Sequence, residues 1–269
     1  MSTPTGKNIR RSFGRAAPVY DDYAIVQQQI VEKLVHKVQH FALPFEPRIL
    51  EIGAGTGTLT RKLNQLWPHA DYIVTDVSID MLKRARMNIG TRRGINYVAM
   101  DAGKLAVEGP FDLIVSSMIL QWLPDPIQSI QDIGRLLVPG GVFAFAFLEK
   151  KSFSSWRQAC DKVGVSCGLW DYVPLADVKT TPGVFAVQEK IQTFFDNAEG
   201  FLMNLKSIGS GTPRLGHQPL TPKQMKRALA EANRMKPFVV NYEVIFGAYQ
   251  ATSGIADLPN TVRASDTTS

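Results

Sequence analysis

The stretch Arg48–Thr58, with the sequence RILEIGAGTGT, decides the fold of this chain. Its first five residues are a short run centred on isoleucine and leucine, which is typical of a buried β-strand. Glycine follows at positions 53, 55 and 57, and glycine lets the chain turn sharply and lets a ligand approach the backbone. A helix that starts after such a turn directs backbone N–H groups at anionic ligands. The stretch therefore predicts a strand, a ligand-binding turn and a helix.

Segments with strand and helix patterns alternate on both sides of this turn. We expect strands at 48–52, 72–75, 97–100, 112–116 and 142–148, and helices at 21–41, 59–66, 80–88 and 126–137. Nearly continuous apolar strands separated by helices favour a doubly wound α/β fold, in which helices cover both faces of a parallel sheet. After residue 148 we expect helices at 152–163, 197–208 and 222–232, strands at 184–195 and 238–249, and irregular chain over 164–183.

Composition and chain patterning predict one folded domain. The 269 residues are 45% hydrophobic and 20% charged, as in ordinary globular proteins. We expect a basic N-terminal segment over 1–20, with 1–7 mobile, a single domain over 21–250 and a polar tail over 251–269. Within the domain, 48–148 would form the cofactor-binding core, and 149–235 the substrate and cap elements with the last helices.

Other sequence features exclude several classes of protein. No apolar run approaches the roughly 18 residues of a membrane-spanning helix, and the N-terminus lacks the apolar core of a secretory signal. The two cysteines, Cys160 and Cys167, have no Cys/His cluster nearby, so neither a disulfide framework nor a structural metal site is expected. We therefore predict a cytoplasmic protein without a bound metal.

Positive charge is concentrated in two zones of the chain. Lys and Arg total 30 against 24 Asp and Glu, which gives a net charge of +6. Seven basic residues lie within 203–236, where Glu231 is the single acid, and residues 1–16 carry four basic residues and no acid. Such zones indicate either an acidic partner, which would be nucleic acid, an anionic membrane or an acidic protein, or simply a solvated surface.

The spacing of the glycines distinguishes between cofactors. A dinucleotide fingerprint, G-x-G-x-x-G, would need glycine at Thr58. The pattern E-x-G-x-G-x-G over 51–57 instead resembles motif I of the class I S-adenosylmethionine-dependent methyltransferases. In that family the acid, here Glu51, engages the methionine end of the cofactor, and the glycines pass beneath it.

Two further acids follow the next two strands. Asp76 comes after the second strand, where a carboxylate can accept both ribose hydroxyls. Asp101 comes after the third, and in the family this acid and the small residue beside it meet the adenine. The cofactor-binding residues implied together are Glu51, Gly53, Ala54, Gly55, Gly57, Asp76, Val77, Met81, Asp101, Ala102 and Ser117. Ser117 stands where the family is expected to have asparagine, so a backbone contact would survive there and a side-chain amide contact would not.

Five further segments resemble one family, the malonyl-acyl carrier protein O-methyltransferases of biotin synthesis. They are SFGRAAPVYDDYA (12–24), FDLIVSSMILQWLPD (111–125), LKSIGSG (205–211), PLTPKQMKRA (219–228) and VNYEVIFGAYQ (240–250). The resemblance covers about residues 8–250. It implies a class I methyltransferase (Rossmann-like) fold with a mostly parallel seven-stranded sheet, an antiparallel last strand and helical cap insertions.

The resemblance also implies a reaction. The methyl group of S-adenosylmethionine would pass to the free carboxylate of malonyl-acyl carrier protein, giving the methyl ester that starts pimeloyl synthesis. That carboxylate is ionised at neutral pH and needs no general base, so the enzyme must align the reactants and exclude water. Arg15 and Arg157 are candidates for binding the carboxylate, Tyr20 for closing the pocket and Trp122 for walling the acyl channel. Each also has a simpler interpretation, as an exposed arginine or a packed aromatic residue.

The basic zones would then serve the acidic carrier protein. Lys223, Lys226 and Arg227 share one face of a predicted helix, Lys206 and Arg214 flank it, and the basic N-terminus would assist. We expect neither nucleic acid nor membrane as partner; against nucleic acid, the basic stretch lacks interleaved exposed aromatics and any recognisable binding module. Three alternatives remain: a methyltransferase of this fold acting on a free small molecule, such as a quinone precursor or short carboxylic acid; a nucleic-acid-binding or -modifying protein; and a non-catalytic S-adenosylmethionine-binding protein.

Overall fold

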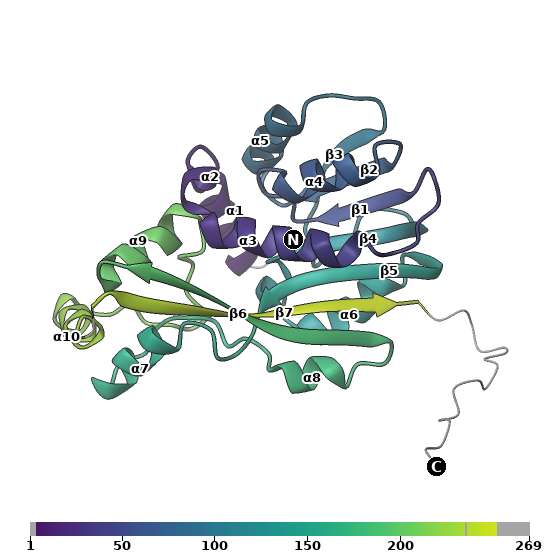
Figure 1. Cartoon of the computed structure of the whole chain (residues 1–269). Helices are drawn as coiled ribbons and strands as arrows, with labels where there is room; N and C mark the ends of the chain where they lie inside the picture. The colour runs from purple at the N-terminus through teal and green to yellow at the C-terminus, as the bar shows by residue number, and fades with distance from the viewer. Residues whose placement is uncertain (1–3, 235, 252–269) are drawn as a thin grey trace, which may run out of the picture.

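In the computed structural model, which describes residues 4–234 and 236–251, the chain is organised around one seven-stranded sheet (Figure 1). The strands are β1 (Arg48–Ile52), β2 (Asp71–Asp76), β3 (Ile95–Ala99), β4 (Phe111–Ser117), β5 (Leu137–Leu148), β6 (Val184–Phe195) and β7 (Phe238–Gln250), in the order β3-β2-β1-β4-β5-β7-β6. The first five are mutually parallel, and β7 is antiparallel to both β5 and β6. The predicted mostly parallel sheet with an antiparallel last strand is confirmed.

Both faces of the sheet are buried, because alternate residues of its central strands enter different hydrophobic clusters. On β1, Ile49 belongs to the cluster beneath α3 (Ile25–Val38) and α4 (Thr58–Leu66). On the same strand, Leu50 and Ile52 belong to the cluster beneath α6 (Pro126–Gly134). The helix α5 (Ile79–Ile89) packs against β2 and β3. This double cover explains why the strands read as nearly continuous apolar runs.

The N-terminal segment differs from the prediction. A helix, α1 (Pro4–Ala16), occupies the stretch expected to be mobile, so that expectation is wrong for 4–7, while 1–3 lie outside the described residues. Ile9, Phe13 and Ala16 are spaced four and three apart, and this face packs toward the rest of the protein. The helix expected over 21–41 is divided at Ala24 into α2 (Tyr20–Tyr23) and α3.

The cap is built on an extension of two strands. β7 pairs with β5 only from Val244 onward, and its first half pairs with β6 alone. In Figure 1 this ribbon projects from the main sheet and carries α7 (Ser154–Lys162), α9 (Ala198–Ser207) and α10 (Pro222–Ala232). Phe153, Phe201 and Tyr242 form the aromatic core beneath the helices. The predicted irregular region 164–183 contains one short helix, α8 (Leu175–Lys179).

The ends of the remaining helices and strands agree with the predicted ones within a few residues, with one exception. Residues Leu137–Gly141, expected to end a helix and turn, belong instead to β5, where Leu137 pairs with Phe111. The polar tail predicted from 251 lies outside the described residues beyond Ala251. Within the described part of the chain, no helix is both long and apolar enough to cross a membrane.

Candidate functional site

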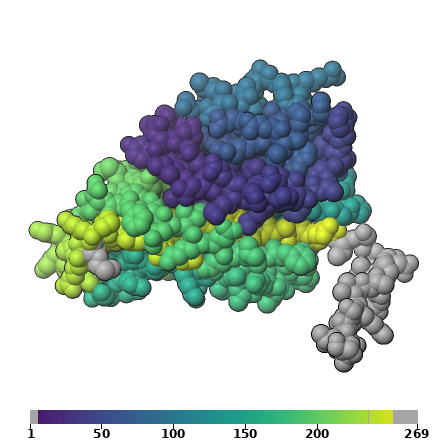
Figure 2. Space-filling model, in the orientation of Figure 1, coloured from purple at the N-terminus to yellow at the C-terminus, as the bar shows by residue number. Residues whose placement is uncertain are grey.

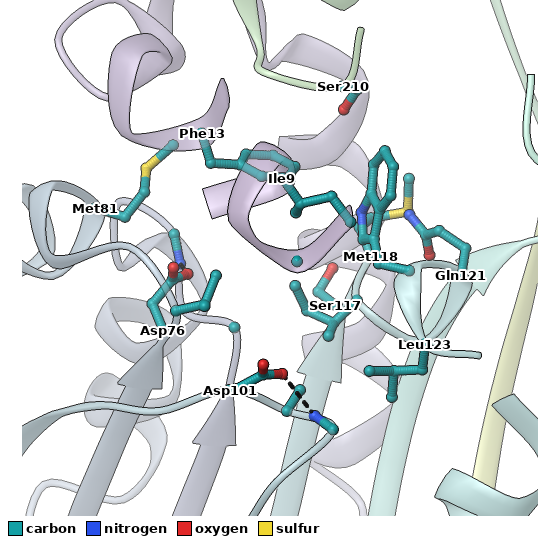
Figure 3. Close-up of a pocket in the computed structure, with 18 of the residues that line it drawn as sticks. Ile9, Phe13, Asp76, Met81, Asp101, Ser117, Met118, Gln121, Leu123 and Ser210 are labelled. Atoms are coloured by element: carbon teal, nitrogen blue, oxygen red, sulfur yellow. Dashed lines mark hydrogen bonds between the residues drawn. The ribbon is translucent and has the colours of Figure 1, made fainter. Parts of the chain in front are cut away.

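A cavity of about 420 Å³ opens where the parallel strands end (Figure 3). Its floor comes from the loops after β1, β2, β3 and β4, and α1 covers it with Ile9 and Phe13. Ligand sites in proteins usually enclose about 300–1,000 Å³, and in open α/β sheets they lie at the carboxyl ends of the strands. A smaller cavity of about 50 Å³ adjoins it and shares Gly53, Gly55 and Ser117 in its lining.

The glycine turn after β1 shapes both cavities. Gly53, Gly55 and Gly57 have φ angles of 76°, 55° and 85°, a region that favours glycine. A Cβ on Gly53 would lie 2.1 Å from the side chain of Ile119, and one on Gly57 would lie 2.6 Å from that of Ile89. A Cβ on Gly55 would meet no protein atom within 4 Å. A side chain at Gly53 or Gly57 would therefore need a neighbouring isoleucine to move as well as a strained φ, whereas Gly55 borders open space that a ligand can fill.

Asp76 joins the end of β2 to this turn. Asp76 is 7% exposed, and its carboxylate accepts hydrogen bonds from Gly55 N at 2.9 Å and Ser78 N at 2.8 Å. Burial raises the pKa of the Asp76 carboxyl, and these two backbone hydrogen bonds act in the opposite direction. Each carboxylate oxygen keeps a further lone pair. Asp76 is therefore positioned both to hold the glycine turn and to accept ligand hydroxyls in the cavity.

Glu51 lines the smaller cavity together with a second acid, Asp21. Glu51 is 2% exposed, and the Thr60 hydroxyl donates a hydrogen bond to its carboxylate. Burial raises the pKa of Glu51 to about 7; the bond from Thr60 lowers it and the neighbouring Asp76 carboxylate raises it. A positively charged ligand group in this cavity would favour the ionised form of Glu51.

The other predicted cofactor residues surround the same space. Asp101 follows β3 and accepts a hydrogen bond from Gly103 N at 3.0 Å, the dashed line of Figure 3. Of the predicted cofactor residues, those that line one or both cavities are Glu51, Gly53, Ala54, Gly55, Asp76, Val77, Met81, Asp101, Ala102 and Ser117. Gly57 lines neither, and its place is structural, as the N-cap of α4. The two acids, the glycine turn and the open space beside Gly55 fit a polar nucleoside-containing ligand such as S-adenosylmethionine.

Tyr20 lies between the two cavities and lines both. Burial raises the pKa of its phenol, and the carboxylates of Asp76 and Asp21 raise it further, so the phenol stays neutral. Asp21 accepts hydrogen bonds from the hydroxyl of Thr56 and the amide of Asn88, which fasten α2 to the glycine turn. The wall position is compatible with the predicted closing role, and the same ring packs against the cluster of Ala16, Ala17 and Met81.

The two arginine candidates lie outside the cavity lining. Arg15 is exposed at the end of α1. Arg157 donates hydrogen bonds to the carbonyls of Ser152 at 3.1 Å and Trp170 at 2.7 Å, and its guanidinium lies over the ring of Tyr172. Arg157 is therefore occupied in joining α7 to the following loop. The structure brings neither arginine to the site that sequence reasoning assigned to it.

The predicted docking residues lie on the surface of the cap. Lys206, Lys223 and Lys226 are exposed. Arg214 forms an ion pair with Asp171 at 2.9 Å, and Arg227 donates to the carbonyl of Val163 at 3.2 Å. None of the five lines the cavity, although Ser210 and Leu215, in the loop that contains Arg214, do. In Figure 2 the yellow-green surface of α10 forms one end of the molecule.

Several cavity residues escaped the sequence reasoning. Phe13 and Trp170 pack edge to face against Trp122, with ring-centre separations of 5.8 and 5.5 Å. Trp122 itself is predicted from the sequence as a wall residue, and it lines the cavity. Ile9 and Gln121 also line the cavity. The i, i+4 spacing of Ile9 and Phe13 was a usable signal, whereas Trp170 lies in irregular chain with no periodic pattern. Across the described ranges, no group of three or more His, Cys, Asp or Glu residues is arranged to hold a metal.

Comparisons with known proteins agree with this site. A family described as a methyltransferase domain matches residues 50–143. The malonyl-[acyl-carrier protein] O-methyltransferase of Magnetococcus marinus is 36% identical over 247 residues, which cover 90% of this chain and 91% of that protein. The one from Neorickettsia risticii is 32% identical, with 89% and 94% covered. The biotin biosynthesis bifunctional protein BioCD of Bordetella avium is 35% identical over 93% of this chain, and the match spans 53% of that protein.

Solved structures share the fold at low sequence identity. A putative methyltransferase from Bacillus halodurans superposes with a TM-score of 0.58 at 14% identity, covering 83% of this chain and 99% of that one. The N-methyltransferase NodS of Bradyrhizobium japonicum, in complex with S-adenosyl-L-homocysteine, gives 0.52 at 18% identity, covering 91% and 100%. These likenesses show the class I methyltransferase fold. The identity to the Magnetococcus enzyme extends over nine tenths of both chains, so the protein belongs to the malonyl-[acyl-carrier protein] O-methyltransferase family.

Proposed function

We propose that this protein transfers the methyl group of S-adenosylmethionine to the free carboxylate of malonyl-acyl carrier protein, giving the methyl ester used in biotin synthesis. The observation that carries the proposal is the 36% identity, over 90% of the chain, to a protein named for this reaction. The cavity supports it, because its acidic residues lie at the strand ends and most of its wall is apolar.

The cofactor would lie across the ends of β1, β2 and β3. Asp76 would accept the ribose hydroxyls, Asp101 with Ala102 would meet the adenine, and Glu51 would attract the amino group of the methionine end. The solved relative with S-adenosyl-L-homocysteine has the same fold, which supports a cofactor of this class here. When bound, S-adenosylmethionine supplies a methyl group activated by the positive charge of its sulfonium.

The protein's task is alignment and exclusion of water. The malonyl carboxylate is ionised at neutral pH, since carboxyl pKa values lie near 4 in the absence of perturbation. Its oxygen forms the new O–C bond as the S–C bond breaks, the electron pair stays on sulfur, and no proton moves. The cover provided by Ile9 and Phe13 would keep water from the carboxylate. The cavity therefore needs no general base.

The acidic carrier would dock on basic helices of the cap and of the cavity cover. We assign this to Lys223, Lys226 and Arg227 on α10, assisted by Lys206 and Arg214 and by the basic face of α1. α1 covers the cavity and places Lys7, Arg10, Arg11 and Arg15 on its exposed side. A carrier bound across these helices would bring its acyl arm to the rim formed by Leu215.

A methyl-transfer assay with malonyl-acyl carrier protein, malonyl-coenzyme A and free malonate tests the proposal. Methylation of the malonyl thioesters, with the carrier-bound form preferred, is the expected result. Preference for free malonate would favour the alternative, a methyltransferase of this fold acting on small acids. Transfer to none of the three would overturn the proposal.

A further inference from the structure

One buried amide in the cavity wall has a carbonyl oxygen without a hydrogen-bond donor among the described residues. Gln121 belongs to the short 3₁₀ turn η1 (Leu120–Trp122), which follows β4, and is 7% exposed. Its Oε1 is enclosed, and no donor to it is found within residues 4–234 and 236–251. A buried polar group without a partner is less favourable than an apolar side chain of the same size. The polarity of Gln121 is therefore better explained by a ligand than by protein packing.

Gln121 lies away from the residues assigned to the cofactor. Figure 3 shows Gln121 and Met118 on one side of the cavity and Asp76 and Met81 on the opposite side. Around Gln121 the lining is apolar and aromatic, with Trp122 and Leu123 as its neighbours in the chain. This is the part of the cavity left for the second reactant.

The cavity offers that reactant few charged partners. No arginine lines it among the described residues, and its one lining cation, Lys104, is exposed. A guanidinium would bind a carboxylate through two strong charge-assisted bonds and engage the lone pairs that must attack the methyl group. A carboxamide also provides two N–H donors but carries no charge, so it orients a carboxylate without neutralising it.

We infer that the carboxamide N–H of Gln121 binds the substrate carboxylate, leaving one carboxylate oxygen turned toward the methyl group. Because no donor in the described part of the chain holds Oε1, rotation about the Cγ–Cδ bond can direct the N–H donors into the cavity without breaking a hydrogen bond to Oε1 there. The inference rests on the proposed function, since it assumes an anionic acyl substrate. It also gives the carboxylate the partner that Arg15 and Arg157 do not provide.

The first test replaces Gln121 by Met and uses Gln158→Met as a control, since Gln158 is exposed on α7. With malonyl-coenzyme A and malonyl-acyl carrier protein as substrates, Gln121→Met should lower kcat/KM by about 10- to 100-fold, chiefly through KM. S-adenosyl-L-homocysteine affinity, measured by calorimetry, should stay within about two-fold of the wild type. The melting temperature should not fall, because an unpartnered polar group is removed.

The second test is Gln121→Glu, which keeps the shape and adds a titratable group. An ionised Glu repels the substrate carboxylate, whereas a protonated Glu donates an O–H in place of the N–H. The ratio of kcat/KM between variant and wild type should therefore rise as the pH falls from about 8 to about 6, since burial raises carboxyl pKa values into this range. A purely structural role would leave that ratio constant.

The outcomes separate the two proposals. If the wild type methylates malonyl thioesters and Gln121→Met does so equally well, the Gln121 inference is wrong and the proposed function stands. Loss of S-adenosyl-L-homocysteine binding in Gln121→Met would also overturn it, because Gln121 would then serve the cofactor or the fold. A wild type that methylates neither thioester would overturn both.

Discussion

Gly209 packs directly against the backbone of Phe13. An ideal Cβ on Gly209 would lie 2.9 Å from the Cα of Phe13 and 3.1 Å from its N, and Gly209 has a φ of 75°. Gly209 follows α9, and Phe13 belongs to α1 over the cavity. Two segments far apart in the sequence thus meet backbone to backbone, and this contact is one of those between α1 and the rest of the protein.

Replacing Gly209 by Ala should loosen α1. The added methyl group must displace backbone atoms, and the alanine must adopt a strained φ angle. We therefore expect the free energy of docking of this helix to weaken by more than about 1 kcal/mol. Faster hydrogen exchange of α1 amides and weaker S-adenosyl-L-homocysteine binding are the readouts. Gly211→Ala is the control, because its Cβ would meet its nearest neighbour at an ordinary 3.5 Å. Equal behaviour of the two variants would contradict the proposed role.

Asp76→Ala should weaken cofactor binding. The variant removes the acceptor assigned to the ribose hydroxyls, which we expect to cost about 1–3 kcal/mol, or roughly 5- to 150-fold in affinity. Calorimetry of S-adenosyl-L-homocysteine measures the change. Asp80→Ala is a matched control, since Asp80 is exposed at the start of α5. An Asp76 variant that binds as tightly as the wild type would remove this assignment.

Gly55→Val should abolish cofactor binding in a folded protein. The side chain would enter the open space that Gly55 borders and that we assign to the cofactor. Gly90→Val carries a similar positive-φ penalty, with φ 86° and no atom near its Cβ, but Gly90 lines neither cavity. Circular dichroism should show both variants folded, and binding should be lost in Gly55→Val alone. Normal binding by Gly55→Val would mean that the glycine serves turn geometry only.

Cofactor affinity should rise with pH near neutrality. Glu51 has a pKa raised to about 7, so an increase in pH from about 6 to about 7.5 ionises it and strengthens its attraction for the ammonium group of the ligand. In the ligand-free protein, the effect of pH on folding stability has the opposite sign, because the folded state holds the Glu51 proton more tightly than the unfolded state. The contribution of Glu51 to stability is therefore present below the ordinary pKa near 4.5 and is lost as the pH rises through about 7.

Calorimetric titrations of S-adenosyl-L-homocysteine across this range test the pH dependence. Glu51→Gln should bind more weakly at pH 7.5 and should lose most of the slope. An identical slope in this variant would assign the titration to another group.

Reversal of basic surface charge should separate carrier docking from chemistry. Lys223, Lys226 and Arg227 changed together to Glu should lower turnover of malonyl-acyl carrier protein steeply at low salt and that of malonyl-coenzyme A much less. The same reversal of Lys7, Arg10 and Arg11 compares α1 with α10. Equal losses with both substrates, or no loss with either, would show that the altered surface is only solvated.

The order of strands and helices, and the position of three acids at the strand ends, could be predicted from sequence because both depend on local patterns. Short apolar strands alternating with amphipathic helices define a parallel sheet, and parallel strands bring their carboxyl ends to one edge. Glu51, Asp76 and Asp101 each stand at or just after such an end, so their meeting follows from chain order alone. The antiparallel last strand was expected from the family resemblance, not from periodicity.

Tertiary packing decided the rest, because contacts between distant segments leave no periodic signal in either one. Phe13 is a cavity residue only because α1 folds back over the sheet and meets Gly209. The sequence alone allowed Arg157 to face a substrate, but in the structure its guanidinium donates hydrogen bonds to two backbone carbonyls. Gln121 is distinguished by an Oε1 that has no donor among the residues that the structure describes, a property that depends on every residue packed around it.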